Sequence, residues 1–205
     1  MNTTLQHTFP IILASQSQAR AMILRNAGVQ FTIQPSYLDE DDIKNQAKEN
    51  RDSPEKCAQD LAIAKAMKIS ERFSDSYVIG ADQIMICEGR WFDKAPTKEV
   101  AMEQLRFLRG KKHTLITAAC VVKGNVVLWQ ALSNPQLTMR SFSELFLDDY
   151  VNKLGNDLLK SVGCYQLEGL GAQLFDKVDG DMFEIMGLQI IHLLGFLRAE
   201  NLING

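Results

Sequence analysis

The chain has 205 residues, and its 22 Lys and Arg residues against 25 Asp and Glu residues give a formal net charge of −3. This near-neutral balance excludes a strongly basic nucleic-acid-binding protein, although it leaves room for a basic pocket that binds one anionic small molecule. The hydrophobic share of 46% excludes a disordered chain, and the length suits one large domain or two small ones.

The sequence contains no membrane or export signal. No apolar run approaches the roughly 20 residues that a membrane-spanning helix needs. The segment from residue 1 to residue 10 lacks the basic start and the apolar stretch of a signal peptide. We therefore expect a cytoplasmic protein without a membrane partner.

Cysteine and histidine spacing predicts no metal centre. No CxxC pair exists, so zinc binding and dithiol redox chemistry are not expected. Reduced, mostly buried thiols are predicted at Cys57, Cys87, Cys120 and Cys164. Structural or surface roles are predicted for the isolated histidines His7, His113 and His192.

The first part of the chain alternates between predicted strands and helices. A short buried strand over residues 10–14 precedes an amphipathic helix that ends at Gly28. Residues 29–33 alternate apolar and polar side chains, which favours a second strand. The acidic residues 39–42 are expected in a loop, and the polar stretch 41–52 is expected to be mobile.

The remaining elements follow from capping, turn and periodicity signals. Ser53-Pro54-Glu55 is typical of a helix start, and the strand-like residues 77–86 are interrupted by one carboxylate. The further predicted elements are a turn at 88–90, a helix at 97–108, strands at 113–122 and 126–139, a helix at 143–154, Gly-rich strands after it, and a closing helix at 184–202. Together they predict a mixed α/β fold, with flanking helices and two lobes around a central sheet.

Hydroxyl and basic side chains follow the first predicted strand, in the segment Ser15-Gln16-Ser17-Gln18-Ala19-Arg20. The positive end of the following helix suits a phosphate, Ser15 and Ser17 add hydroxyl donors, and Arg20 can contact two phosphate oxygens at once. The alternative is that Ser17 only caps the helix while Arg20 is a solvated charge. The segment is not a P-loop, because G-x-x-x-x-G-K-[ST] is absent.

Asp82 is a carboxylate inside an apolar strand, where an unpaired buried charge would be costly. A partner is therefore expected, either a lysine, a metal ion or backbone donors, and a purely structural role is the alternative. Glu40 offers a second carboxylate that can share a divalent ion. Oxygen ligands beside a phosphate favour Mg²⁺.

Two lysines are further candidates for binding an anion. Lys65 shares a predicted helix face with Leu61 and Ile69, so its ammonium either reaches past the apolar stripe to water or points into a polar site. Lys94 directly precedes a predicted helix and can supply a point charge to a phosphate. The alternative for Lys94 is an ordinary solvated lysine.

Taken in order, these residues resemble the Maf-like nucleoside triphosphate pyrophosphatases over nearly the whole chain. The motifs that carry the resemblance are Leu13-Ala14-Ser15-x-Ser17-x-x-Arg20, Asp39-Glu40, Leu61-Ala62-x-x-Lys65-Ala66, Gly80-Ala81-Asp82, Lys94, Leu108-x-Gly110-x-x-His113, Gly180-Asp181 and Gly187-Leu188. The resemblance implies one two-lobed domain over residues 1–205, with a cleft similar to that of inosine triphosphate pyrophosphatases.

The resemblance also implies an activity. A nucleoside triphosphate would be hydrolysed between its α- and β-phosphates, giving a monophosphate and pyrophosphate, with Mg²⁺ or Mn²⁺ as the divalent cation. A homodimer with no nucleic-acid partner is implied as well. An alternative is a nucleotide-binding regulator of cell division with weak or no turnover, and another is a pyrophosphatase of the dTTP/UTP type.

Residue roles are carried over from the resemblance position by position. Those implied to bind the triphosphate are Ser15, Ser17, Arg20, Lys65 and Lys94. Asp82 is implied to be either the base for the attacking water or a metal ligand, and Glu40 is implied to assist the metal or the water. Phosphoanhydride hydrolysis needs positive charge at the phosphate oxygens and an oriented water, which this set can supply.

Some positions depart from the usual family pattern. Gln18-Ala19 replaces Pro-Arg, Asp93-Lys94-Ala95 replaces Gly-Lys-Pro, and Gly187-Leu188-Gln189 replaces Gly-Leu-Pro. Gln83 and Glu168 resemble the 7-methyl-GTP pyrophosphatase subgroup. A carboxylate at Glu168 suits the N–H donors of a guanine edge, whereas an amide suits a pyrimidine. The alternative is that Glu168 is an idle surface acid.

Overall fold

The computed structural model describes residues 10–204, so His7 and the other residues of the segment 1–9 lie outside the described range. The strands are β1 (Ile11–Leu13), β2 (Thr32–Ile33), β3 (Tyr77–Cys87), β4 (Arg90–Phe92), β5 (Lys112–Lys123), β6 (Val126–Ser133), β7 (Gln136–Met139) and β8 (Phe175–Asp179). The α-helices are α1 (Gln18–Asn26), α2 (Glu40–Glu49), α3 (Pro54–Ser70), α4 (Lys98–Leu108), α5 (Glu144–Leu154), α6 (Met182–Ile185) and α7 (Ile190–Ala199). The 3₁₀ helices are η1 (Gly155–Lys160), η2 (Val162–Cys164) and η3 (Leu170–Leu174). Among these described helices, none is long and apolar enough to cross a membrane.

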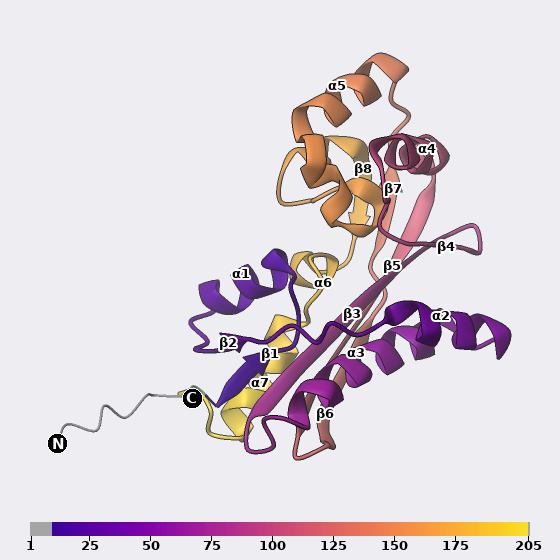
Figure 1. Ribbon diagram of the computed structural model, residues 1–205. Coiled ribbons are helices and arrows are strands. Elements are labelled where there is room, and N and C mark those ends of the chain that lie inside the picture. Colours follow the sequence, from indigo (N-terminus) through magenta and orange to yellow (C-terminus); the bar gives the residue numbers. More distant parts are fainter. Residues whose placement is uncertain (1–9, 205) are drawn as a thin grey trace.

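The described strands form one mixed sheet in the order β2-β1-β3-β5-β7-β8, with β4 paired to β3 and β6 paired to β5. The pairs of β1 with β2 and with β3 are parallel, whereas β5 is antiparallel to β3. The predicted fold class, a mixed central sheet with flanking helices, is therefore confirmed (Figure 1).

The long strands β3 and β5 run through both lobes of the molecule (Figure 1). At one end they pair with β1 and β6, and the helices α1, α2, α3 and α7 cover this lower lobe. At the other end they pair with β4 and β7, and α4, α5, η1–η3 and β8 complete the upper lobe. The cleft discussed below lies where the two lobes meet.

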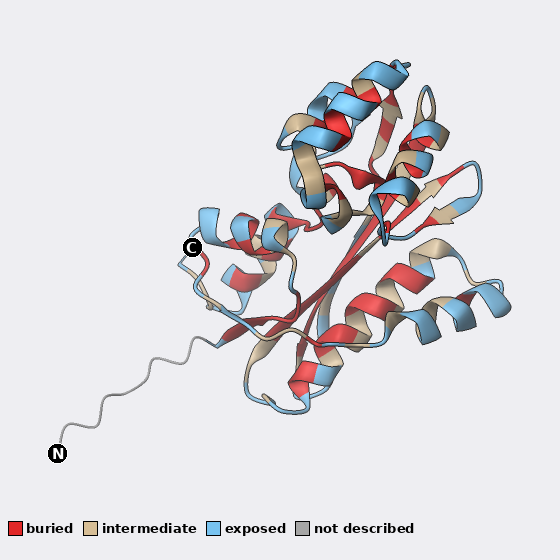
Figure 2. Cartoon of the chain, turned by 45° about the horizontal axis from the view of Figure 1, so that its top comes forward, coloured by how far each residue is buried: buried red, intermediate tan, exposed pale blue. Residues whose placement is uncertain are grey.

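Alternation along β3 decides which face of the sheet each side chain joins. Val78 and Ile84 pack with α3 on one face, whereas Ile79 and Ala81 pack with α1 and α7 on the other. The buried residues of α3 lie along its sheet-facing side (Figure 2). Asp82 consequently faces α3, the helix that carries Lys65.

Gly80 allows α3 and β3 to approach each other closely. A Cβ atom at this position would lie 2.1 Å from the carbonyl oxygen of Ala62 and 2.9 Å from Cβ of Ala66. Only a residue without a side chain fits such a contact between a helix and a strand. This close packing brings Lys65 of α3 within hydrogen-bonding distance of Asp82 of β3.

The predictions of an acidic loop at residues 39–42 and of a mobile stretch at 41–52 are wrong, because helix α2 forms there. Asp39 caps the helix, and its Oδ1 accepts from the backbone N–H of Asp41 at 3.2 Å. Acidic residues fill the first turn, where the helix dipole favours negative charge. Ile43 and Ala47 are one turn apart and pack into the core beside α3. The polar composition therefore concealed a helix with one narrow apolar side.

Other predicted elements are shorter than expected or divided. Residues 29–33 form a strand only at β2, and the predicted strand 126–139 is divided around Pro135, which has no N–H for a sheet. The Gly-rich strands expected after α5 are mostly 3₁₀ turns, with β8 as the strand that forms there. The closing helix predicted at 184–202 divides into α6 and α7, because Gly187 has a φ of +101°.

The strongest local signals are confirmed. Ser53 and Ser143 cap α3 and α5 by accepting from backbone N–H groups three residues later. Gly124 and Asn125 both have positive φ in the predicted hairpin turn. The four cysteines are free and buried, and burial raises the pKa of the Cys57 thiol to about 11. Such a thiol stays protonated and unreactive at neutral pH.

Candidate active site

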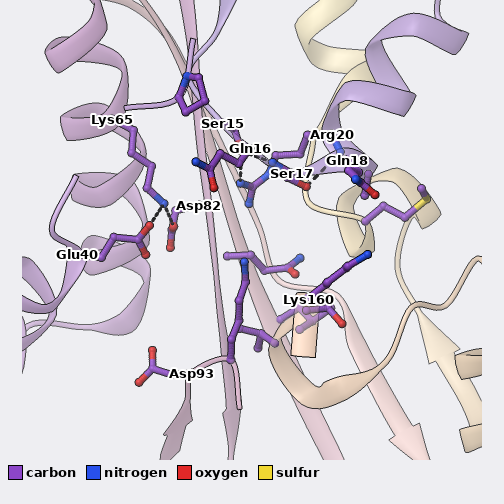
Figure 3. A pocket seen from close by; sticks show the side chains of 18 of the residues that line it. Ser15, Gln16, Ser17, Gln18, Arg20, Glu40, Lys65, Asp82, Asp93 and Lys160 are labelled. Carbon is purple, nitrogen blue, oxygen red and sulfur yellow. Dashed lines mark hydrogen bonds and ion pairs between the residues drawn. The ribbon is translucent and has the colours of Figure 1, made fainter. Parts of the chain in front are cut away.

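A cavity of about 800 Å³ opens between the two lobes and is lined by residues of both. Its lining includes side chains that are distant in sequence (Figure 3). The predicted site residues found in this lining are Ser15, Ser17, Arg20, Glu40, Lys65, Asp82, Gln83, Lys94 and Glu168. The fold therefore brings all the predicted positions to one cleft.

Lys65 lies between two carboxylates in the lower lobe (Figure 3). Its Nζ donates to Oδ1 of Asp82 at 2.5 Å and pairs with Oε1 of Glu40 at 2.7 Å. Lys65 and Asp82 are 8% and 5% exposed, so neither charge is held by bulk water. The expected partner of Asp82 is thus a lysine, and Lys65 points into a polar site rather than past the apolar stripe to solvent. Removing one member of such a pair would leave a buried charge uncompensated.

Glu40 remains ionised because several lysines surround it. Partial burial by itself would raise its pKa, but Lys65, Lys44 and Lys94 outweigh burial and hold the pKa of Glu40 below its usual value. Its place in the first turn of α2 also favours the charged form. Glu40 and Asp82 are therefore two carboxylates that lie close to several cationic groups of the cleft.

The segment between β1 and α1 places Ser15 and Arg20 side by side. The Arg20 guanidinium donates from Nη1 to Ser15 Oγ at 3.2 Å and to the carbonyl of Ala81 at 3.0 Å. Its Nε donates to the carbonyl of Gly187 at 2.9 Å. Ser17 also caps α1, since its Oγ accepts from the backbone N–H of Arg20 at 3.3 Å. Arg20 is consequently fixed by the backbone and is not a freely solvated charge.

Burial lowers the pKa of two cations of the cleft, Arg20 and Lys94. Desolvation lowers the pKa of Arg20, although Asp82 and Glu40 oppose that change. Desolvation also lowers the pKa of Lys94, and the nearby charge of Arg20 lowers it further. Arg20 stays protonated at every physiological pH. The mutual repulsion of Arg20 and Lys94 favours an anion between them.

Gln83 lies on the sheet face opposite Asp82. Its Nε2 donates to Thr117 Oγ1 at 2.7 Å and to the carbonyl of Ile185 at 3.1 Å. The amide therefore ties β3 to β5 and to α6. A role for Gln83 in reading the base stays a prediction.

Several cleft residues were missed by sequence reasoning. Lys44 lines the cleft, pairs with Asp93 at 2.7 Å and lies 3.6 Å from Oε2 of Glu40. Its spacing four residues after Glu40 on a helix was the available signal. Lys160 also lines the cleft and pairs with Asp157 at 2.6 Å, but it lies in a 3₁₀ turn without any recognisable motif.

His113 has the structural role that its isolation predicts. Its Nε2 forms a hydrogen bond of 2.8 Å with the hydroxyl of Tyr165, a residue that lines the cleft. Nδ1 has no hydrogen-bond partner among residues 10–204. Burial lowers the pKa of His113 to about 4, so the ring is neutral at physiological pH.

Glu40 and Asp82 form the donor set with which a divalent cation would have to be bound. Within the described range, no group of three or more His, Cys, Asp or Glu side chains is placed to hold a metal alone. Both carboxylates converge on the Lys65 ammonium, so the space between them already accommodates a positive charge. Mg²⁺ commonly takes one or two carboxylates together with substrate phosphates. The two residues therefore fit a cation that arrives with a triphosphate.

A comparison with protein families adds to this geometry. The family model described as Maf-like protein matches residues 10–200, which is most of the chain. The chain belongs to the Maf-like family. The family named from the sequence motifs is therefore confirmed.

Curated relatives of this Maf-like chain match it over nearly its full length. A protein of Granulibacter bethesdensis named nucleoside triphosphate pyrophosphatase is 47% identical over 190 residues, covering 93% of this chain and 96% of its own. One from Paramagnetospirillum magneticum with the same name is 43% identical and covers 92% and 97% of the two chains. A protein of Brucella abortus named 7-methyl-GTP pyrophosphatase is 39% identical and covers 97% and 100%.

Proposed function

We propose that the cleft hydrolyses a nucleoside triphosphate between its α- and β-phosphates and releases pyrophosphate. The chain belongs to the Maf-like family, and relatives that match it over nearly their whole length are named nucleoside triphosphate pyrophosphatase. The observation that carries the reaction is the buried pair of Lys65 and Asp82, with the half-buried Glu40 on the same lysine, beside the fixed guanidinium of Arg20. It combines an oriented carboxylate with positive charge in one cavity.

The triphosphate is proposed to lie between Arg20 and Lys94, near the first turn of α1. Ser15 Oγ already contacts Arg20, so the hydroxyl and the guanidinium form one donor surface. Each cation stabilises the negative charge that accumulates on the phosphate oxygens as the bond breaks. Holding the phosphates on two sides also fixes the α-phosphorus for in-line attack by water.

Asp82 is proposed to orient the attacking water and to take its proton. Its Oδ1 accepts from Nζ of Lys65, which fixes the carboxylate in one direction. The other oxygen is available for water or a cation. Glu40 and Asp82 would hold a divalent cation, which when bound supplies charge to the phosphates and lowers the pKa of water. Lys65 maintains the spacing between the two carboxylates.

The base is proposed to be a guanine, with 7-methyl-GTP as the favoured substrate. Glu168 lines the upper side of the cleft and is exposed, so its carboxylate is free to accept from the N1–H and N2–H₂ groups of guanine. Methylation at N7 makes the base cationic, which strengthens its attraction to a carboxylate. A relative of full length is named 7-methyl-GTP pyrophosphatase.

Pyrophosphate release with Mg²⁺ or Mn²⁺ tests the reaction. Asp82→Asn is expected to lower the rate by roughly 10²–10⁴-fold, because the general base is lost. Circular dichroism serves as the folding control, and Asp60→Asn, on the same helix as Lys65 but outside the cleft, serves as the matched variant. Nucleotide binding without release by the unaltered protein would instead indicate a regulator, and full activity of Asp82→Asn would refute the assigned base.

The identity of the base is tested separately. Glu168→Gln is expected to reduce the preference for 7-methyl-GTP over UTP, because an amide no longer accepts two N–H groups or pairs with a cationic base. The ratio of kcat/KM for the two nucleotides is the measurement. A ratio that equals that of the unaltered protein would show that Glu168 does not read the base.

The state of the protein in the cell completes the proposal. We propose a cytoplasmic homodimer that acts as a single two-lobed domain and binds no nucleic acid. Sedimentation velocity at micromolar concentration is expected to give twice the mass of the chain. A mobility-shift assay with single- and double-stranded DNA is expected to show no complex.

A further inference from the structure

The loop between β4 and α4 carries Lys94 and is attached to the opposite lobe by an ion pair. Nζ of Lys44, in α2, lies 2.7 Å from Oδ1 of Asp93, the residue directly before Lys94. Lys44 belongs to the lower lobe and Asp93 to the upper lobe, so this contact links the two lobes across 49 residues of sequence. Both residues line the cavity (the Asp93 side chain is labelled in Figure 3).

The same loop is held from inside the upper lobe. The buried Gln104 of α4 donates from Nε2 to the carbonyl of Asp93 at 3.1 Å. Ala95, on the other side of Lys94, is 3% exposed and belongs to the upper core. The backbone on both sides of Lys94 is thus anchored, and the side chain of Asp93 is the part that reaches the other lobe.

An ion pair of this kind contributes little to overall stability. The side chain of Asp93 is 58% exposed, and pairs with one solvated member are worth about 0–1 kcal/mol. Its location has a larger consequence, because a shift of the loop moves the Lys94 ammonium directly. Contacts that place a charge within an ångström of its target affect binding far more than folding.

We propose that Lys44 and Asp93 are positioning residues for nucleotide binding: their ion pair fastens the Lys94 loop to α2 and so holds Lys94 toward the triphosphate. This inference rests on the proposed function, since it assumes that Lys94 contacts phosphate. The pair also brings a second cation, Lys44, to within 3.6 Å of Glu40. The negative charge of Glu40 on α2 is therefore balanced by Lys44 of the same helix and by Lys65 of α3.

The competing reading is that Lys44 is itself a phosphate ligand that Asp93 merely occupies. The two readings predict opposite results for Asp93→Ala. If Asp93 positions the loop, its removal raises KM; if it competes with phosphate for Lys44, its removal frees the lysine and lowers KM. Lys44→Ala raises KM under both readings, so it cannot decide alone.

The test measures kcat and KM for pyrophosphate release in Lys44→Ala, Asp93→Ala and the double variant. Each single variant is expected to raise KM by roughly three- to tenfold with kcat within twofold, and the double variant is expected to match the singles because the residues act through one contact. Lys44→Arg, which preserves the pair, is expected to restore KM. In a Lys94→Ala background, Asp93→Ala is expected to have no further effect.

Asp60→Ala is the matched control, because the Lys56–Asp60 pair is of similar length, 2.6 Å, and lies on α3 outside the cleft. It is expected to leave KM unchanged. An unchanged or lowered KM in Asp93→Ala, with pyrophosphate still released, would overturn the inference and leave the proposed function standing. If the unaltered protein released no pyrophosphate, the proposed function would fail, and the same variants compared by calorimetric Kd for the nucleotide would still decide the positioning role.

Discussion

The two walls of the cleft differ in how far their side chains are already paired. In the lower wall, Lys65 contacts both Asp82 and Glu40, and Arg20 donates to two backbone carbonyls. In the upper wall, Lys160 pairs with an exposed carboxylate of its own turn, and Glu168 forms no ion pair within residues 10–204. The charges of the lower wall are thus held by contacts within the protein, whereas Lys160 and Glu168 of the upper wall are exposed and held weakly.

The difference matches the demands of the two tasks. Hydrolysis needs charges held in place at the moment the bond breaks, since reorganising them would add to the barrier. Recognition of a base tolerates side chains that adjust on contact, because the energy is gained once the ligand is bound. Substitutions in the lower wall should therefore affect both folding and rate, and substitutions in the upper wall should affect mainly affinity.

Among the substitutions that compare the stability and the rate of the two walls, Lys65→Met is expected to have the largest combined effect. The rate of pyrophosphate release should fall by roughly 10²–10³-fold, because the lysine that holds Asp82 and Glu40 in place is lost. The free energy of unfolding should fall by about 3 kcal/mol, because the buried carboxylate of Asp82 is left without its lysine. Urea denaturation and a pyrophosphate assay measure the two effects. If stability and rate both equalled those of the unaltered protein, the lower wall would not be pre-organised by this lysine.

Gly80→Ala addresses the packing on which the lower wall depends. The added methyl group would meet the carbonyl of Ala62 at 2.1 Å, so α3 must move away from β3. We expect a loss of about 3 kcal/mol in the free energy of unfolding. A lower kcat should accompany it, because Lys65 moves with α3. Gly195→Ala, in α7 where φ is not positive and a methyl group meets no atom within 4 Å, distinguishes crowding from the general effect of replacing a glycine. Equal losses in the two variants would contradict the packing argument.

The free energy of unfolding should depend on pH through His113, which packs beneath the upper wall against Tyr165. Burial lowers its pKa from 6.5 to about 4, so the folded state binds this proton less readily than the unfolded chain. Stability from this residue is complete above pH 6.5 and is lost as the pH falls toward 4, by up to about 3 kcal/mol. His113→Gln, which cannot titrate, should reduce that dependence in denaturant titrations. Identical pH dependence in both proteins would assign the acid sensitivity to other groups.

The smallest effect is expected for Lys160→Met. Its pair with Asp157 is more than half exposed on both sides, so the free energy of unfolding should change by less than about 0.5 kcal/mol. KM for the nucleotide should rise by roughly two- to fivefold, because a cation leaves the cleft lining. Lys153→Met removes a similarly exposed pair on α5 and should leave KM unchanged. Equal KM values in the two variants would show that Lys160 does not face the ligand.

Sequence reasoning found the lower wall more completely than the upper one. Asp82 stands out because a carboxylate in an apolar strand demands a partner, and Arg20 stands out because it follows a strand and two hydroxyls. Such signals are local. The hydrogen bond between Lys65 and Asp82, which are 17 residues apart, depends on the contact of α3 with β3. Gly80 permits that contact, and no spacing rule in the sequence specifies it.

The errors also have physical causes. Helix α2 was read as a loop because its acids suggest solvation, although they stabilise a helix start, and Ile43 and Ala47 supply only a narrow apolar side. Lys160 was missed because a lysine in a 3₁₀ turn has no pattern, and only the folded chain brings it to the cleft. The sequence therefore predicts which residue types carry chemistry better than which surface they share.

The continuity of β3 and β5 has a mechanical consequence. Both strands pass uninterrupted from one lobe to the other, so the sheet itself joins the lobes as a two-stranded ribbon. Bending or twisting of this ribbon would open or narrow the space between the lobes. Cleavage of the chain near residue 82 would interrupt β3 and leave neither fragment with the full pairing of β3 with β5.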